Sequence, residues 1–138
     1  MKTYPHNSPK AMARILAMVM VADGHMDERE LDLLEQLKLY DILAINRRDF
    51  IEVLHDYCEE LAESADADGK VHPVDRARID ALLDTVEEPK KRLLLCAMVL
   101  DMSKADAEFS EIEMAILTHM LDRWHLTLED IETAFADE

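Results

Sequence analysis

The scarcity of glycine constrains this chain more than any other feature. Only Gly24 and Gly69 occur among its 138 residues, together with four prolines. An all-β domain needs far more residues of the kind that form tight turns. Alanine, leucine, methionine and glutamate, which favour helices, recur throughout the chain instead. The sequence therefore predicts an all-α fold, and the length predicts a single domain over residues 1–138.

Helix start signals recur along the chain and predict a bundle of about seven helices. Ser8, followed by a proline, supplies a cap and a first-turn residue, and Ser110 with Glu113 matches a capping box. The predicted helices begin near Ser8, Asp27, Asn46, Pro73, Pro89, Ser110 and Thr127. Residues 40–45 are predicted to form a loop or a short turn, and residues 1–8 to be loosely held.

The predicted helix that begins at Pro89 has two unusual features. Its segment Leu93–Leu100 is apolar on nearly all sides, so we expect this helix to occupy the centre of the bundle. Its first turn carries Lys90, Lys91 and Arg92, where the helix macrodipole disfavours cations. Either neighbouring acids neutralise these three side chains, or the side chains form a docking patch.

A nine-residue pattern occurs three times, in residues 22–30, 67–75 and 105–113. Each copy reads Ala-Asp-small-x-apolar-cap-x-x-acid. The small residue can end one helix, while the cap and the acid three residues later bond the first free amides of the next helix. The pattern therefore predicts an internal pseudo-repeat of helix–acidic corner–helix units.

Capping does not require the aspartate at the second position of each copy. A carboxylate there, close to the acid seven residues later, can hold a hard divalent cation such as Ca²⁺ or Mg²⁺. Residues 64–75 also match part of a calcium-loop pattern, although Ser64 and Asp75 stand where Asp and Glu are usual. The candidate metal ligands are Asp23, Asp27, Glu30, Asp66, Asp68, Asp75, Asp106 and Glu113. The alternative is that these acids serve only as helix caps.

The formal net charge of −16 narrows the classes of partner. Such a charge repels phosphate backbones, which argues against nucleic acid, and it attracts cations and basic protein surfaces. A second explanation is that the negative charge serves only to keep the domain soluble. No apolar run is long enough to cross a bilayer and the N-terminus lacks a secretory signal, so the expected location is cytoplasmic. No glycine-rich phosphate loop and no nucleophile with a nearby base is evident, so we do not expect an enzyme.

The cysteines and histidines suggest little further chemistry. Cys58 and Cys96 lie within apolar helical runs and are predicted to be buried thiols. His55 shares a helix face with Cys58, but no second pair completes a zinc site. His119 and His125 lie near a helix end, where the macrodipole is sufficient to explain them.

Corners of the form Asp-Gly-x5-Glu in both halves of an acidic helical chain resemble the tellurite-resistance TerB family, over residues 11–126. The segment Glu87–Leu94 is similar to that family's sequence at the start of its second half. The resemblance implies one negative, metal-binding surface and membrane-associated partners in a stress response. It assigns that surface to Asp23, Gly24, Glu30, Asp106 and Glu113. Ala107 departs from the glycine that is usual in the family, which weakens the expectation of two equivalent metal sites.

Two functional hypotheses follow. The first is a non-enzymatic protein-interaction domain whose acidic face binds divalent cations or a basic partner, in tellurite, metal or oxyanion stress. The second is a structural or assembly module that acts through an apolar helix face, for which the nine methionines are suited. In the second hypothesis the acidic corners serve only as caps. The sequence leaves the oligomeric state open.

Overall fold

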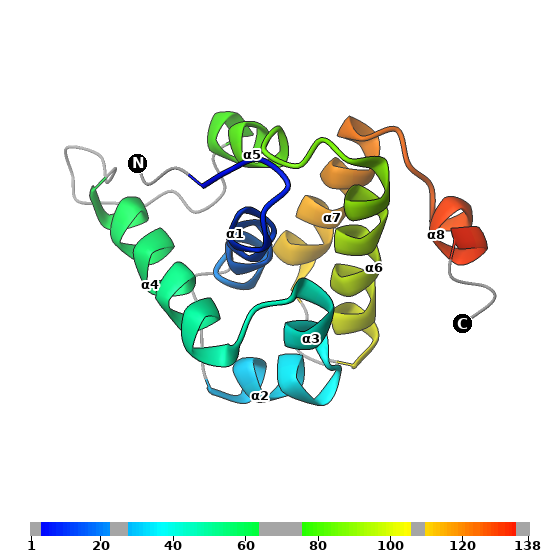
Figure 1. The fold of residues 1–138 in the computed structure, drawn as a ribbon. Helices are drawn as coiled ribbons and strands as arrows, with labels where there is room; N and C mark the ends of the chain where they lie inside the picture. The colour runs from blue at the N-terminus through cyan, green and yellow to red at the C-terminus, as the bar shows by residue number, and fades with distance from the viewer. Residues whose placement is uncertain (1–3, 23–27, 64–75, 106–109, 135–138) are drawn as a thin grey trace.

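The computed structural model describes residues 4–22, 28–63, 76–105 and 110–134. These ranges contain eight helices and no strand, which confirms the all-α prediction. The helices are α1 (Pro9–Met20), α2 (Glu28–Gln36), α3 (Leu39–Leu43), α4 (Arg47–Glu63), α5 (Arg76–Leu83), α6 (Pro89–Ala105), α7 (Glu111–Arg123) and α8 (Leu128–Ala134) (Figure 1). The additional helix is α3, within the segment that was predicted to be a loop.

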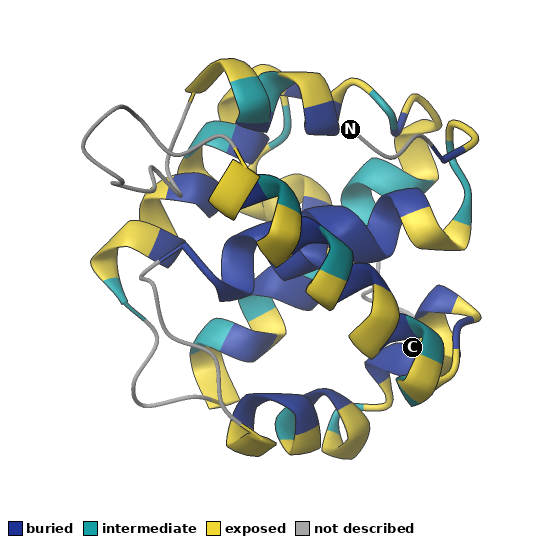
Figure 2. Ribbon diagram, turned by 90° about the vertical axis from the view of Figure 1, so that its left-hand side faces the viewer, coloured by how far each residue is buried: buried dark blue, intermediate teal, exposed yellow. Residues whose placement is uncertain are grey.

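Helix α1 is the centre of the bundle. Every residue from Ala11 to Met20 is buried, and α1 packs against α3, α4, α5, α6 and α7 (Figures 1 and 2). Ser8 Oγ accepts a hydrogen bond from Ala11 N at 3.1 Å, and Pro9 occupies the first turn, so the predicted start of this helix is confirmed. Alanines at several positions allow the surrounding helices to approach the α1 backbone closely.

The prediction that α6 occupies the centre is wrong. Its residues Leu95, Cys96, Met98 and Val99 are buried, but Leu93, Leu94, Ala97 and Leu100 are only partly buried. Helices α1, α2, α7 and α8 pack against α6 and leave part of its circumference uncovered. The apolar run in the sequence therefore contains both core residues and surface residues.

Helix α3 forms because three of its five residues have a buried place to pack. Leu39, Tyr40 and Leu43 are buried, and Tyr40 donates its hydroxyl hydrogen to Leu31 O at 3.1 Å. The Tyr40 ring also meets Phe50 edge-on, with ring centroids 5.5 Å apart. Residues with positive φ bound the helix on both sides, Lys38 at 60° and Ala44 at 60°. A helix this short depends on tertiary packing rather than on propensity.

Residues 4–8 contact distant parts of the chain, and the looseness predicted for residues 1–8 stays a prediction. Tyr4 is buried, and its ring lies 4.8 Å from the guanidinium carbon of Arg14, a cation–π contact. Asn7 donates its backbone N–H to Thr85 O at 2.9 Å. Its side-chain Oδ1 accepts hydrogen bonds from the N–H groups of Glu87 and Glu88, just before α6. Asn7 thus caps a helix from about 80 residues away in sequence.

The corner before α7 has the predicted capping box. Glu113 N donates to Ser110 Oγ at 3.1 Å, and Ser110 N donates to Glu113 Oε1 at 3.2 Å. The central residues of all three corner patterns lie outside the described residues, so the pseudo-repeat stays a prediction. Met114, in the first turn of α7, is 41% exposed.

Across the described parts of the chain, we find no helix with the length and apolar character required to span a bilayer.

Candidate functional site

Most of the predicted metal ligands lie outside the described residues, and nothing can be said of their positions. These are Asp23, Asp27, Asp66, Asp68, Asp75 and Asp106. The remaining two, Glu30 and Glu113, are both buried, at 8% and 2% exposure. Glu113 Oε1 accepts hydrogen bonds from the Ser110 backbone and hydroxyl. The capping half of the sequence interpretation is therefore confirmed at this corner, and a metal-binding role stays a prediction.

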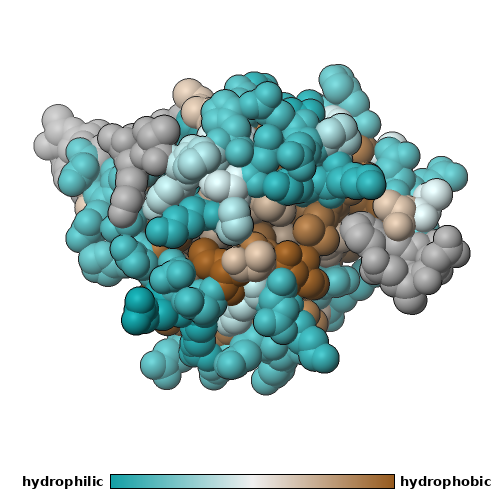
Figure 3. All heavy atoms as spheres, viewed as in Figure 1, coloured by the Kyte–Doolittle hydropathy of each residue, from teal (hydrophilic) through white to brown (hydrophobic). Residues whose placement is uncertain are grey.

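An apolar groove lies between α3, α6 and α8. It has a volume of about 310 Å³, with Met98 and Ile131, both buried, among the residues that line it. The other apolar lining residues are Ile42, Leu94, Ala97 and Leu100. Figure 3 shows apolar side chains gathered across the middle of this face of the molecule, with hydrophilic residues above and below. The partly covered side of α6 is thus a wall of this groove.

The charged residues around the groove are mostly acidic. Asp101 and Glu132 line it, and Lys104 is the one base among its lining residues. Outside the groove lining, the same helices carry the exposed acids Asp41, Glu129 and Asp130 and the exposed base Lys90. An apolar floor within an acidic rim is suited to a ligand that combines apolar and basic groups.

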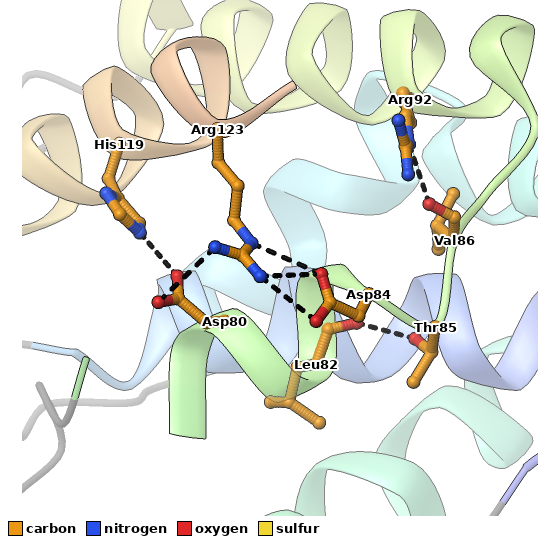
Figure 4. A network of polar contacts seen from close by, with 8 residues as sticks. All are labelled: Asp80, Leu82, Asp84, Thr85, Val86, Arg92, His119 and Arg123. Atoms are coloured by element: carbon orange, nitrogen blue, oxygen red, sulfur yellow. Dashed lines mark hydrogen bonds and ion pairs between the residues drawn. The ribbon is translucent and has the colours of Figure 1, made fainter. Parts of the chain in front are cut away.

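Figure 4 shows a second set of contacts, which joins α5 to α7. His119 Nε2 lies 2.6 Å from Asp80 Oδ1, and Arg123 NH1 lies 3.5 Å from Asp80 Oδ2. Arg123 also donates to both carboxylate oxygens of Asp84, at 2.9 and 3.0 Å. The hydrogen bond from His119, assisted by the charge of Arg123, lowers the pKa of Asp80. Each charge in this network already has a partner, so we assign it a structural role as a clamp.

Two of the basic residues in the first turn of α6, Lys91 and Arg92, make contacts within the fold. Lys91 Nζ donates to Asn7 O at 2.6 Å and lies 3.5 Å from Glu88 Oε2. Arg92 Nε donates to Val86 O at 2.8 Å (Figure 4). The guanidinium carbon of Arg92 also lies 5.5 Å from the centroid of the Trp124 ring. Lys91 thus has an acidic neighbour, as the first alternative expects, whereas Arg92 is held by a backbone carbonyl and an aromatic ring.

The two cysteines differ, contrary to the prediction that both are buried. Cys96 is buried within α6, but Cys58 is exposed on α4. The prediction failed for Cys58 because the buried residues nearest to it on α4, Tyr57 and Leu61, lie on a neighbouring side of the helix. Burial raises the pKa of Cys96 to about 12.

In the folded protein, iodoacetamide is expected to modify Cys58 and to leave Cys96 unmodified. The thiolate is the reactive form, and Cys96 is fully buried as well as protonated at neutral pH. Burial also raises the pKa of Cys58, which slows its reaction without blocking access. Peptide mass spectrometry, with and without guanidinium, measures both sites. Equal modification of both thiols without denaturant would contradict this assignment.

The groove was missed at the sequence level because its walls come from segments far apart in the chain. Ile42, Leu94 and Ile131 belong to three different helices. The one available signal was the apolar run of α6, which is longer than a single buried face requires.

Among the described residues, one group could hold a metal ion, namely His55, Asp56 and Glu59 on α4.

Comparison with known proteins gave no match. Neither the family models, nor the curated proteins, nor the solved structures contain one that matches this chain. The resemblance to TerB therefore stays an expectation from short motifs, and the function must be argued from the geometry.

Proposed function

We propose that this chain is a non-enzymatic protein-interaction domain that binds a basic amphipathic helix in the groove between α3, α6 and α8. The observation that carries the proposal is the apolar wall of α6. Leu94, Ala97 and Leu100 are each only partly buried although they belong to one continuous apolar run. A groove that exposes such a stripe is typical of surfaces that receive the apolar face of a partner helix.

The size and the charge of the groove support a helical partner. A volume of about 310 Å³ accommodates a few aliphatic side chains rather than a whole domain. The acidic rim, with Asp101 and Glu132 against Lys104, favours lysine and arginine on the flanks of the incoming helix. The net charge of −16 adds a long-range attraction that speeds the encounter with a basic partner.

A synthetic peptide provides the test. A fluorescent amphipathic peptide of about 18 residues, with leucines at i, i+3, i+4 and i+7 and lysines elsewhere, is titrated with the protein and its anisotropy is measured. We expect saturable binding that weakens with salt, because exposed charge pairs are screened. A scrambled peptide of the same composition, which has no apolar face, is expected to bind much more weakly.

Two isoleucines of similar exposure give a matched pair of variants. Ile42, at 44% exposure, lines the groove, whereas Ile51, at 41% exposure, lies on α4 outside it. Ile42→Asp is expected to reduce peptide affinity about tenfold or more, because it places a charge against the apolar face of the peptide. Ile51→Asp is expected to leave affinity unchanged. Equal losses in the two variants, or equal binding of the scrambled peptide, would rule out this groove as the binding surface.

The resemblance to TerB suggests a cellular process in which this binding takes place. In this process the domain acts in the response to tellurite, metal or oxyanion stress, together with membrane-associated partners. The corner carboxylates that capping does not require would bind Ca²⁺ or Mg²⁺ there. This part of the proposal is supported by the three sequence copies and by the confirmed cap at Ser110 and Glu113, which identifies the acid that capping uses.

A further inference from the structure

A group of potential metal ligands lies on α4, on the part of its surface that faces solvent. The group consists of His55, Asp56 and Glu59, whose nearest ligand atoms all lie within 4.8 Å of one another. His55 Nδ1 and Glu59 Oε1 are 3.6 Å apart, and their side chains are 71% and 63% exposed. Neither the groove nor the clamp between α5 and α7 includes any of these residues.

Helix geometry explains why these three positions converge. Successive residues are rotated by about 100° around the axis, so positions i and i+1 flank position i+4 one turn further on. Glu59 therefore lies between His55 and Asp56 in angle, and the three side chains form a triangle on a rigid element. Helix α4 is regular over Arg47–Glu63, so the backbone holds this arrangement without a ligand.

The spacing of one ligand pair is close to what a single ion requires, and the third ligand atom lies within 4.8 Å of both. Two ligands that each lie about 2.1 Å from one ion, in tetrahedral or octahedral geometry, are about 3.0–3.5 Å from each other. The 3.6 Å between His55 Nδ1 and Glu59 Oε1 needs only a small side-chain adjustment to reach that range. Since the group is exposed, water can supply the remaining ligands.

The donor types select a class of metal. One imidazole with two carboxylates suits Zn²⁺, Cu²⁺, Ni²⁺ and other first-row transition ions, whereas Ca²⁺ and Mg²⁺ prefer oxygen ligands alone. From Glu52 to Glu63 the helix carries five acids and neither lysine nor arginine. Its bases, Arg47 and Arg48, stand at the opposite end. The C-terminal half of α4 also lies at the negative end of the helix dipole.

We propose that His55, Asp56 and Glu59 form a binding site for one first-row transition-metal dication of the zinc class, completed by water. The site differs in its residues and in ligand chemistry from the Ca²⁺ or Mg²⁺ sites that the acidic corner sequences suggest. It also differs from the His55–Cys58 pair considered above as half of a zinc site. In the proposed site the other protein ligands are carboxylates rather than the thiol. It does not depend on the groove.

Isothermal titration of the full, tag-free chain with ZnCl₂ tests the proposal. We expect one ion per chain, with affinity that rises from Mn²⁺ through Ni²⁺ to Cu²⁺, the order set by ligand-field preferences. His55→Ala and Glu59→Gln are each expected to lower Zn²⁺ affinity about tenfold or more, since each removes a ligand from a set of three. Both side chains are exposed, so the circular dichroism spectrum should be unchanged.

Two control variants separate this site from other donors on the chain. His125→Ala removes an exposed imidazole outside the group, and Cys58→Ser removes the neighbouring exposed thiol. Both are expected to bind Zn²⁺ as the parent chain does. The proposal is overturned if millimolar Zn²⁺ gives no binding, if His55→Ala binds normally, or if Cys58→Ser abolishes binding.

Discussion

Leu16→Ala is expected to lower the free energy of unfolding by about 2–5 kcal/mol, a large part of the stability of a domain of this size. Leu16 is fully buried in α1, the helix that contacts most of the others, so its removal leaves a cavity that no single neighbour can fill. Urea denaturation followed by circular dichroism at pH 7 measures the loss. An unchanged slope with denaturant would show that the variant still unfolds from the same compact state.

Leu94→Ala is the matched control for Leu16→Ala, because both variants replace a leucine by an alanine. Leu94 is only partly buried on the groove side of α6. We expect it to cost about 1 kcal/mol or less, since much of its side chain is already in water. A loss equal to that of Leu16→Ala would mean that this side of α6 belongs to the core, and it would remove the basis of the groove.

Glu113→Ala is expected to cost about 1–2 kcal/mol, whereas Glu113→Gln should cost far less. Glutamine can accept the hydrogen bonds of Ser110 and preserve the capping box, while alanine leaves the buried amide without its partner. Glu111→Ala, an exposed acid in the same turn of α7, is the control and should be nearly neutral. Thermal unfolding measures all three variants.

The same variants test the metal role predicted for this corner. A cation needs the charge of Glu113, which the glutamine variant removes without removing the cap. If Ca²⁺ or Mg²⁺ raises the melting temperature of the parent chain and of Glu111→Ala but not of Glu113→Gln, the carboxylate serves as a ligand. If neither ion shifts the parent at millimolar concentration, the corner is structural.

The sequence predicted those features that depend on neighbouring residues. The caps at Ser8 and Ser110 were correct because each needs only a hydroxyl and free amides within one turn. Phe50 on α4 and Leu82 on α5 are buried, as residues of an apolar stripe at helical spacing must be.

Features set by the packing of distant segments were not predictable in this way. Hydropathy alone placed α6 at the centre, because it cannot tell which sides of a helix its neighbours cover. Likewise, Arg14 on α1 is buried because Tyr4, ten residues earlier in the chain, packs its ring against the guanidinium. The group around His55 was readable in principle, since His-Asp-x-x-Glu places three donors on one helix face.

Two of the three helices that form the groove, α6 and α8, differ in how firmly they are held. Helix α6 packs against four other helices, whereas α8 packs mainly against α6 and has one buried residue, Ile131. Displacing α8 therefore costs little more than exposing one isoleucine, about 1.5–3 kcal/mol, far below the cost of unfolding the bundle. A bound helix would thus contact one fixed side of the groove, α6, and one side that can move, α8. Helices with side chains of different sizes could therefore bind in the same groove.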